Sequence, residues 1–514
     1  MCIRDSLYDD GQQHVTSDGD TFKDEVANDG FYTGVFRVAD SWDYLVDVEV
    51  EDESANFFRY DKVWGFNTRP FTSANRVLVV SDYANGQQFP QIAHPYGAYW
   101  QWSDAEPFLT NKPYDEILPP ESGNPYLWQE SIWEDNLRDC YYSQDYDLWR
   151  VICRGKVPRT VLAAYLPRVA YQADPADPSR IVAVPVADRA VMWAAPYTGD
   201  AWVGAGTILD SDVQEDIRWF VQNGGRTMMT GQDIGWALTN DGQRPSSFLE
   251  EIFGAKYADD LAIMAAYDIG TFSAVAADAD DPVGVDPWYP PGVEHWEDKL
   301  SGSAEDCDWT SDPPSALHTA VWLGDPPDNG PWFLDGCWNN FWPDAITAVG
   351  EAKPVYYYLG PNASAGSGPV AAVRMVHDSG AKTVFFAFGL EAVSREYNQG
   401  CDTIHSRNMR GKVIHNALCW LRTGRVYGTV YSTEGNRPLA GVVVRATEIG
   451  GEEVARAGVT DSEGRYWIDG CEPRPNSIDL YLPGYEDHVP GGWYFVTHGG
   501  DATGPIDWRL TPTP

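Results

Sequence analysis

The stretch Arg226-Thr-Met-Met-Thr-Gly-Gln-Asp-Ile-Gly235 decides how we interpret the fold of this chain. Residues 226–230 have the composition of a short buried strand, which must end at Gly231. A glycine, one residue, a polar residue, one residue and a second glycine is the spacing of a nucleophile elbow, which holds its middle residue in strained backbone angles. Such a turn presents that residue at the carboxyl end of a parallel sheet, where open α/β folds bind ligands. The middle residue here is Asp233, not Ser or Cys.

The composition limits the classes of partner. The 514 residues include 36 Lys and Arg against 76 Asp and Glu, which gives a formal net charge of -40. So acidic a surface repels nucleic acid and anionic membranes, and no apolar run is long enough for a membrane span. An acidic surface suits a secreted or cell-surface protein, with carbohydrate or protein as the expected partner. Residues 1–6 have no signal-peptide character and indicate an artefactual leader on a truncated N-terminus.

The cysteines favour an exported protein over a zinc protein. None of the eight Cys forms a C-x-x-C pair, and His is sparse. Cys140 with Cys153, and Cys307 with Cys337, are candidate disulfides, and unpaired buried thiols are the alternative.

Other strands and helices place the elbow in an α/β domain over residues 75–424. Residues 76–80, 191–195 and 383–388 are continuous apolar runs, typical of parallel strands buried on both faces. A helix is predicted from Ser211, with Gln214 completing a capping box and an apolar face formed by Val213, Ile217, Phe220 and Val221. A second helix is predicted over residues 407–421. Residues 265–350 lack helical periodicity and indicate an insertion of short strands and long loops.

Two β-rich segments flank this domain. Residues 7–70 contain alternating runs at 29–38 and 44–50 and resemble part of an immunoglobulin-like sandwich. Residues 425–514 contain four short strand runs, at 426–431, 440–446, 455–460 and 466–468. This second segment resembles the carboxypeptidase regulatory-like, transthyretin-like sandwich, which implies an accessory module without catalytic residues.

The α/β segment resembles the class I glutamine amidotransferase-like domain of secreted bacterial proteins. The resemblance rests on residues 76–82, 193–200, 224–238, 248–257 and 383–391, which follow one another in order. It implies a flavodoxin-like parallel sheet flanked by β-sandwich modules. Catalytic members carry Cys at the elbow and a His-x-Glu pair after the last strand. Here Asp233 replaces the Cys, and in Gly389-Leu-Glu391 a Gly stands at the position of the His. The resemblance therefore implies the fold but not the activity.

Three roles remain open for Asp233. It could be a nucleophile, with His377 or His405 as the general base. It could join Glu391 and Asp82 as an acid pair or a Ca2+ site. It could also cap the helix predicted over residues 234–238.

The expected ligand-binding residues lie at or just beyond strand ends: Asp82, Tyr197, Asp200, Gln232 and Asp233. No cofactor is expected, with Ca2+ the one ion that these carboxylates could bind. We predict a non-catalytic binding or scaffolding part of a large exported bacterial protein. The alternatives are a hydrolase that uses Asp233 with a nearby His, and the non-catalytic flank of an exported protease whose catalytic domain lies upstream.

Overall fold

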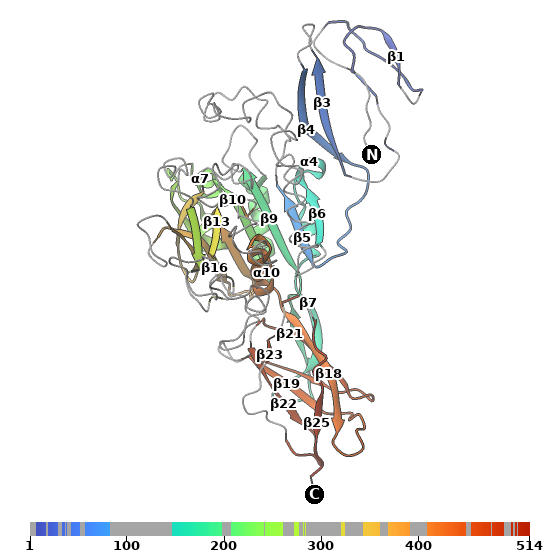
Figure 1. The fold of residues 1–514 in the computed structure, drawn as a ribbon, viewed down its shortest axis with the longest axis vertical. Helices are drawn as coiled ribbons and strands as arrows, with labels where there is room; N and C mark the ends of the chain where they lie inside the picture. Colours follow the sequence, from blue (N-terminus) through green and yellow to red (C-terminus); the bar gives the residue numbers. More distant parts are fainter. Residues whose placement is uncertain are drawn as a thin grey trace, which may run out of the picture.

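The molecule is elongated, with a large central sheet between two smaller β-rich parts (Figure 1). The computed structural model describes residues 7–16, 19–28, 33–35, 38, 43–51, 57–82, 146–197, 207–240, 242–260, 272–276, 281, 283, 320–323, 343–359, 368–390, 409–448, 454–473, 475–487, 495–496, 499–500 and 502–513. None of the described helices is long and apolar enough to cross a bilayer.

The central sheet has 11 strands and is mixed. Five neighbouring strands run parallel, in the order β6 (Tyr146–Arg150), β5 (Val77–Ser81), β9 (Ala190–Tyr197), β10 (Thr227–Gln232) and β17 (Lys382–Phe386). Beyond β17 the sheet continues with antiparallel strands: β16 (Val370–Val376), β15 (Lys353–Leu359), β12 (Phe272–Ala276) and β13 (Ala320–Leu323). The antiparallel pair β14 (Asp344–Ala348) and β11 (Ala255–Asp260) joins the sheet at β16.

The prediction of a flavodoxin-like parallel sheet is wrong. Of the described residues, 43% lie in strands and 17% in helices, and about half of the central sheet is antiparallel. Connection length explains the difference, because a parallel crossover needs a dozen or more residues. Residues 377–381 alone join β16 to β17, so these strands pair antiparallel. The predicted insertion supplies β12, β13 and β14 to the same sheet.

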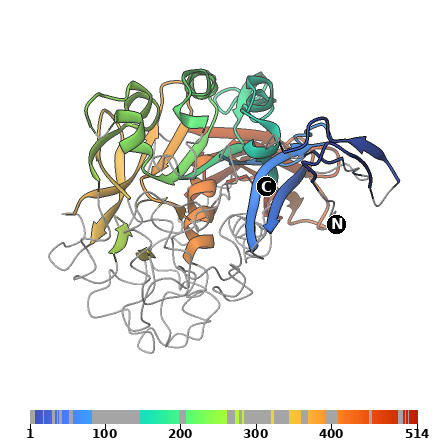
Figure 2. The ribbon, with the colours of Figure 1, turned by 90° about the horizontal axis from the view of Figure 1, so that it is seen from above.

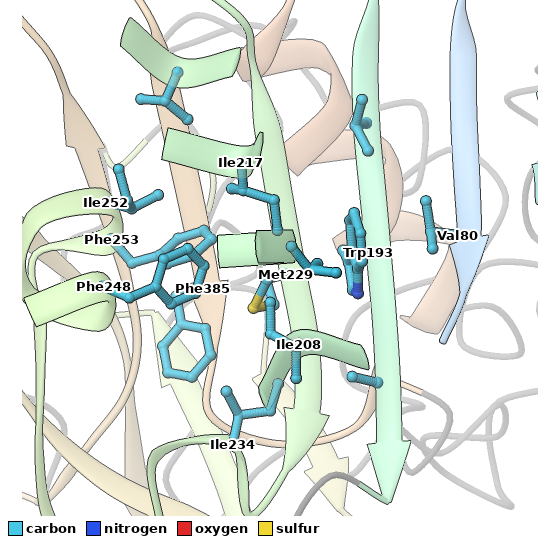
Figure 3. Close-up of a cluster of buried hydrophobic side chains, with 14 of the residues drawn as sticks. Val80, Trp193, Ile208, Ile217, Met229, Ile234, Phe248, Ile252, Phe253 and Phe385 are labelled. Carbon is cyan, nitrogen blue, oxygen red and sulfur yellow. The ribbon is translucent and has the colours of Figure 1, made fainter. Parts of the chain in front are cut away.

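Helices cover both faces of the central sheet (Figure 2). One face carries α5 (Arg159–Ala163), α6 (Ser211–Gln222), α7 (Ile234–Thr239) and α8 (Ser247–Phe253), and the other carries α10 (Met409–Leu421). Figure 3 shows the first of these cores, where Trp193, Met229 and Phe385 of the strands meet side chains of the helices. The predicted apolar face of α6 is confirmed, because Val213, Ile217, Phe220 and Val221 are all buried.

The predicted capping box of α6 is wrong. The helix starts at Ser211, and its N-cap residue is Asp210, which makes no side-chain capping bond. The Gln214 side chain instead donates from Nε2 to the Ile208 carbonyl at 3.0 Å. Gln214 therefore ties the helix to the 3-10 turn Thr207–Leu209 that precedes it.

A two-sheet β module forms the C-terminal part. One sheet contains β18 (Gly424–Ser432), β21 (Arg465–Cys471), β24 (Ala502–Thr503) and β25 (Trp508–Leu510), and the other contains β19 (Val443–Glu448), β20 (Ala455–Val459), β22 (Pro475–Tyr481) and β23 (Phe495–Val496). The second sheet is extended by the hairpin β7 (Arg168–Ala173) and β8 (Ile181–Val186). This hairpin belongs to the predicted α/β segment, so the sheet crosses the predicted boundary at residue 424.

The N-terminal segment contains β1 (Gln13–Val15), β2 (Thr21–Lys23), β3 (Asp43–Glu51) and β4 (Phe57–Asn67), paired as two hairpins. Of the strand predicted over 29–38, the structure describes one bridge, Tyr8 to Thr33. Asp43 fixes the second hairpin to α4 (Val151–Arg154), because Arg154 Nη2 donates to its carboxylate at 2.6 Å. The thiol of Cys153 donates to the Tyr44 carbonyl at 3.3 Å. Cys153 is therefore a buried thiol and not half of a disulfide, so its predicted bond with Cys140 is wrong. Cys307 and Cys337 lie outside the described residues, so the disulfide between them remains a prediction.

Candidate functional site

The turn after β10 has the strained geometry that its spacing predicts. Asp233 has φ 58° and ψ 12°, in the left-handed region, and its side chain is buried. A non-glycine residue pays a steric cost in this conformation, which is held only where the surrounding structure demands it. Asp233 therefore stands at the carboxyl end of β10, between the strand and α7.

The two flanking glycines allow the chain to approach its neighbours closely. A Cβ on Gly231 would lie 2.0 Å from the Ala195 carbonyl oxygen of β9, which is far inside van der Waals contact. A Cβ on Gly235 would lie 3.0 Å from Asp344 Oδ2 and 3.0 Å from the Tyr257 ring. A side chain at Gly231 would therefore push β10 away from β9, and one at Gly235 would crowd the Asp344 carboxylate and the Tyr257 ring.

Asp344 holds the amino end of α7, and Asp233 does not. The amides of Gly235 and Trp236 donate to Asp344 Oδ2 and Oδ1 at 2.6 and 3.1 Å. Asp233 occupies the N-cap position but makes no side-chain capping bond, so its predicted role as the cap is wrong. Asp344 is fully buried and starts β14, more than 100 residues further along the chain. No local signal in the sequence links it to α7.

Asp82 is a structural anchor at the end of β5. Its carboxylate accepts hydrogen bonds from Trp193 Nε1 at 2.7 Å, from the Thr207 amide and hydroxyl at 2.8 Å each, and from the Ile208 amide at 3.1 Å. Burial raises the pKa of Asp82, and the bonds from Thr207, Trp193 and Ile208 oppose that rise. The carboxylate joins β5, β9 and the turn before α6, and four donors occupy its oxygens. Because these donors already bind the Asp82 carboxylate, its predicted role as a ligand-binding residue is disfavoured.

His377 lies at the other end of the sheet from Asp233. Its Nε2 is 3.1 Å from the Ile252 carbonyl and 3.1 Å from the Thr383 hydroxyl. Thr383 pairs with Thr227, six residues before the elbow residue, so strand rise separates His377 from Asp233 by roughly 20 Å. Burial lowers the pKa of His377. At that distance His377 cannot act as a base for Asp233.

The other predicted site residues are only partly placed. Tyr197 and Gln232 are paired residues of β9 and β10, directly before the elbow, and only their backbones are described. Asp200, Glu391 and His405 lie outside the described residues, so their roles remain predictions. Within the described part of the chain, no group of three or more His, Cys, Asp or Glu side chains could hold a metal ion. Ca2+ binding therefore also remains a prediction.

A second set of buried charges lies at the amino ends of the parallel strands. Lys382, the first residue of β17, donates to Glu472 Oε2 at 2.6 Å, and Arg226, directly before β10, donates to Oε1 at 3.3 Å. Glu472 follows β21 of the C-terminal module. Burial acts to raise the pKa of Glu472, but the charges of Lys382 and Arg226 outweigh it and lower that pKa to about 2. Sequence reasoning missed this set because its members lie far apart in the chain.

The same two cations also bind the end of α10. Lys382 Nζ donates to the Trp420 carbonyl at 2.9 Å, and Arg226 Nη1 donates to the Leu421 carbonyl at 2.7 Å. Cations at a helix carboxyl end are favourable because the last carbonyls carry partial negative charge. Glu472, α10 and the two strands β10 and β17 are thereby tied together.

A hairpin completes the contact between the central sheet and the C-terminal module. The Gln172 side-chain amide of β7 makes two bonds with the backbone of Asp469 in β21, at 2.8 and 3.1 Å. Arg168 Nη2 lies 3.2 Å from Asp188 and 3.7 Å from Asp469. The module is therefore held by paired charges and by shared β-structure.

Comparisons with known proteins establish no family. No family model matches the chain, and a search of curated proteins also finds no match. Among solved structures, the minor pilin GBS52 of Streptococcus agalactiae is 13% identical and covers 48% of this chain and 84% of its own, with a TM-score of 0.17. The shaft pilin of Lactobacillus rhamnosus GG is 11% identical and covers 48% of this chain and 94% of its own, with a TM-score of 0.15.

A third similar structure is a carbohydrate-binding protein, described as putative, from Bacteroides uniformis. It is 13% identical and covers 17% of this chain, which spans only 41% of that protein, with a TM-score of 0.15. At these TM-scores none of the three carries an argument about fold or function. None of the comparisons supports the predicted glutamine amidotransferase-like domain.

Proposed function

We propose that this chain is a non-catalytic binding or scaffolding part of an exported bacterial protein. The observation that carries the proposal is the contact of Asp344 with the first amides of α7, at 2.6 and 3.1 Å. A catalytic elbow directs such amides at the negative charge that develops on its substrate. Here an internal carboxylate holds two of them, and its charge would repel a second anion at the same place.

The contacts between the central sheet and the C-terminal module support a scaffolding role. Glu472, with its two cations, and the hairpin β7–β8 join the C-terminal module to the sheet through contacts that are largely buried. Separating the partners of a buried ion pair leaves an uncompensated charge, so these contacts hold the module against the sheet. The acidic composition, with a net charge of -40, fits an extracellular setting.

One observation favours a second candidate, a hydrolase that uses Asp233 with a histidine. Asp233 keeps a strained left-handed backbone although glycine would adopt that conformation freely. His377 is too far away to serve, which leaves His405 as the histidine of this candidate.

Hydrolysis assays on the wild type and on Asp233→Asn test both candidates. We expect neither protein to release p-nitrophenol from p-nitrophenyl acetate, or ammonia from glutamine, above the buffer rate. Turnover by the wild type that Asp233→Asn abolishes, with the melting temperature unchanged, would overturn the scaffold proposal in favour of the hydrolase.

A further inference from the structure

Two large aromatic side chains lie next to each other on the outer face of the C-terminal module. Tyr427 of β18 and Trp467 of β21 are direct partners in an antiparallel pair. Directly opposed residues of such a pair have Cβ atoms about 5 Å apart on the same face of the sheet. Tyr427 is 37% exposed and Trp467 is 53% exposed. We call these two residues the aromatic platform.

The alternation of side chains along β18 and β21 places the aromatic platform outside the core of the module. Val426 and Ile468, the adjacent pair in the same ladder, are fully buried in the core of the module. Alternate residues of a strand point to opposite faces, so Tyr427 and Trp467 point away from that core. Cross-strand packing stabilises such a pair, but it does not require that rings of this size stay open to solvent.

The chain beside Tyr427 leaves its ring accessible. Gly504 follows β24, which pairs with β18, and a Cβ at Gly504 would lie 3.0 Å from the Tyr427 ring. The same Cβ would lie 2.3 Å from the Tyr427 carbonyl oxygen, so glycine lets the backbone pass alongside Tyr427 without crowding its ring. Trp467, Tyr427 and Gly504 therefore form a row across neighbouring strands of the C-terminal module. Strands β18 and β21 of this module lie in the lower part of Figure 1.

Polar side chains lie on both sides of the aromatic platform. The next pair toward the central sheet is Arg425 with Asp469, joined by two hydrogen bonds of 2.7 and 3.0 Å. The next pair in the other direction is Thr429 with Arg465, and Arg465 Nε donates to Asp461 at 3.0 Å. The rings thus form an apolar strip between two rows of hydrogen-bond donors and acceptors, each of which contains an Arg paired with an Asp.

We propose that the aromatic platform binds a neutral glycan. A sugar ring has an apolar face of C–H groups, which packs on an aromatic ring, and a rim of hydroxyls, which the flanking Arg, Asp and Thr side chains can bind. The net charge of -40 disfavours acidic glycans. An apolar protein partner would have to desolvate the flanking ion pairs, which is costly.

This inference names a ligand class for the binding role proposed above and therefore rests on it. Affinity electrophoresis of the full chain tests it, with gels that contain hydroxyethyl cellulose, soluble amylose or xylan and one gel that contains the acidic polymer polygalacturonate. We expect at least one neutral polymer to retard the wild type, and polygalacturonate not to. Trp467→Ala should weaken the retardation by about tenfold or more, and Tyr427→Ala should weaken it in the same gel.

Tyr481→Ala provides the matched control. Tyr481 is also 53% exposed but lies on β22, in the other sheet of the module. The Tyr481→Ala variant should migrate like the wild type in every gel.

The glycan proposal is overturned if no neutral polymer retards the wild type, or if the wild type and Trp467→Ala are retarded equally. A wild-type dimer in light scattering that Trp467→Ala converts to a monomer also overturns it, since the aromatic platform would then be a protein interface. None of these results depends on hydrolysis by Asp233, so the scaffold proposal is tested separately.

Discussion

Lys382 and Glu472 join the central sheet to the C-terminal module through a hydrogen bond of 2.6 Å between Nζ and Oε2. Lys382 starts the last parallel strand, and Glu472 follows β21, 90 residues further along the chain. Arg226 contributes a second cation, and both cations are nearly fully buried. The contact therefore makes the stability of the two parts interdependent.

The first prediction concerns Glu472→Gln and pH. The pKa of Glu472 is about 2 in the folded chain and 4.5 in the unfolded reference, so the stabilisation is complete above pH 4.5 and declines as pH falls toward 2. Glu472→Gln should lower the free energy of unfolding by about 3 kcal/mol at pH 7. Urea unfolding at pH 7 and at pH 3 should show a smaller difference from the wild type at the lower pH.

Glu251→Gln is the control for that experiment. Glu251 pairs with Arg218 at 3.3 Å on an exposed surface, where an ion pair contributes little. A loss of stability at Glu472→Gln no greater than at Glu251→Gln would show that the buried contact does not couple the two parts.

The second prediction concerns the end of α7. Asp344→Ala removes the acceptor of the Gly235 and Trp236 amides, and should lower the free energy of unfolding by about 2 kcal/mol. Chemical denaturation measures the change. Asp344→Asn keeps one acceptor oxygen and should lie between Asp344→Ala and the wild type. If Asp344→Ala were as stable as the wild type, Asp344 would not be the cap.

The third prediction concerns the left-handed backbone of Asp233. Asn tolerates this conformation, so Asp233→Asn should change the free energy of unfolding by less than about 1 kcal/mol. A β-branched residue does not tolerate it, and Asp233→Val should cost about 2 kcal/mol. Thermal unfolding of both variants separates a backbone requirement from a side-chain requirement. Equal losses in the two variants would show that the carboxylate, not the backbone, carries the contribution.

The fourth prediction concerns the close approach at Gly231. Gly231→Ala places a methyl group 2.0 Å from the Ala195 carbonyl, so β9 and β10 must separate locally, at a cost of about 3 kcal/mol or more. Gly350→Ala is the control, because Gly350 has φ +62° but a methyl group added there would meet no atom within 4 Å. That variant should show only the smaller cost of a strained backbone, about 1 kcal/mol. Similar melting temperatures for the two variants would contradict the steric explanation.

Much of the local structure could be predicted from the sequence because local patterns encode it. The apolar spacing of Val213, Ile217 and Phe220 predicts the face that α6 buries. The spacing of Gly231, Asp233 and Gly235 predicts a turn with a strained central residue, and the backbone angles agree. The predicted capping box at Ser211 and Gln214 is absent because Ser211 is the first residue of the helix and not its N-cap. The Gln214 side chain donates to the turn before the helix instead.

The sequence by itself determined that a short buried strand ends in a tight turn at Asp233, since glycine spacing and apolar runs act on neighbouring residues. Only the tertiary structure decided that the sheet is mixed, that Asp344 caps α7, and that His377 lies far from the elbow. It also decided that Glu472 meets Lys382 and Arg226, and that Tyr427 meets Trp467. These contacts depend on strand order and register, which arise from the packing of segments that are remote in the chain.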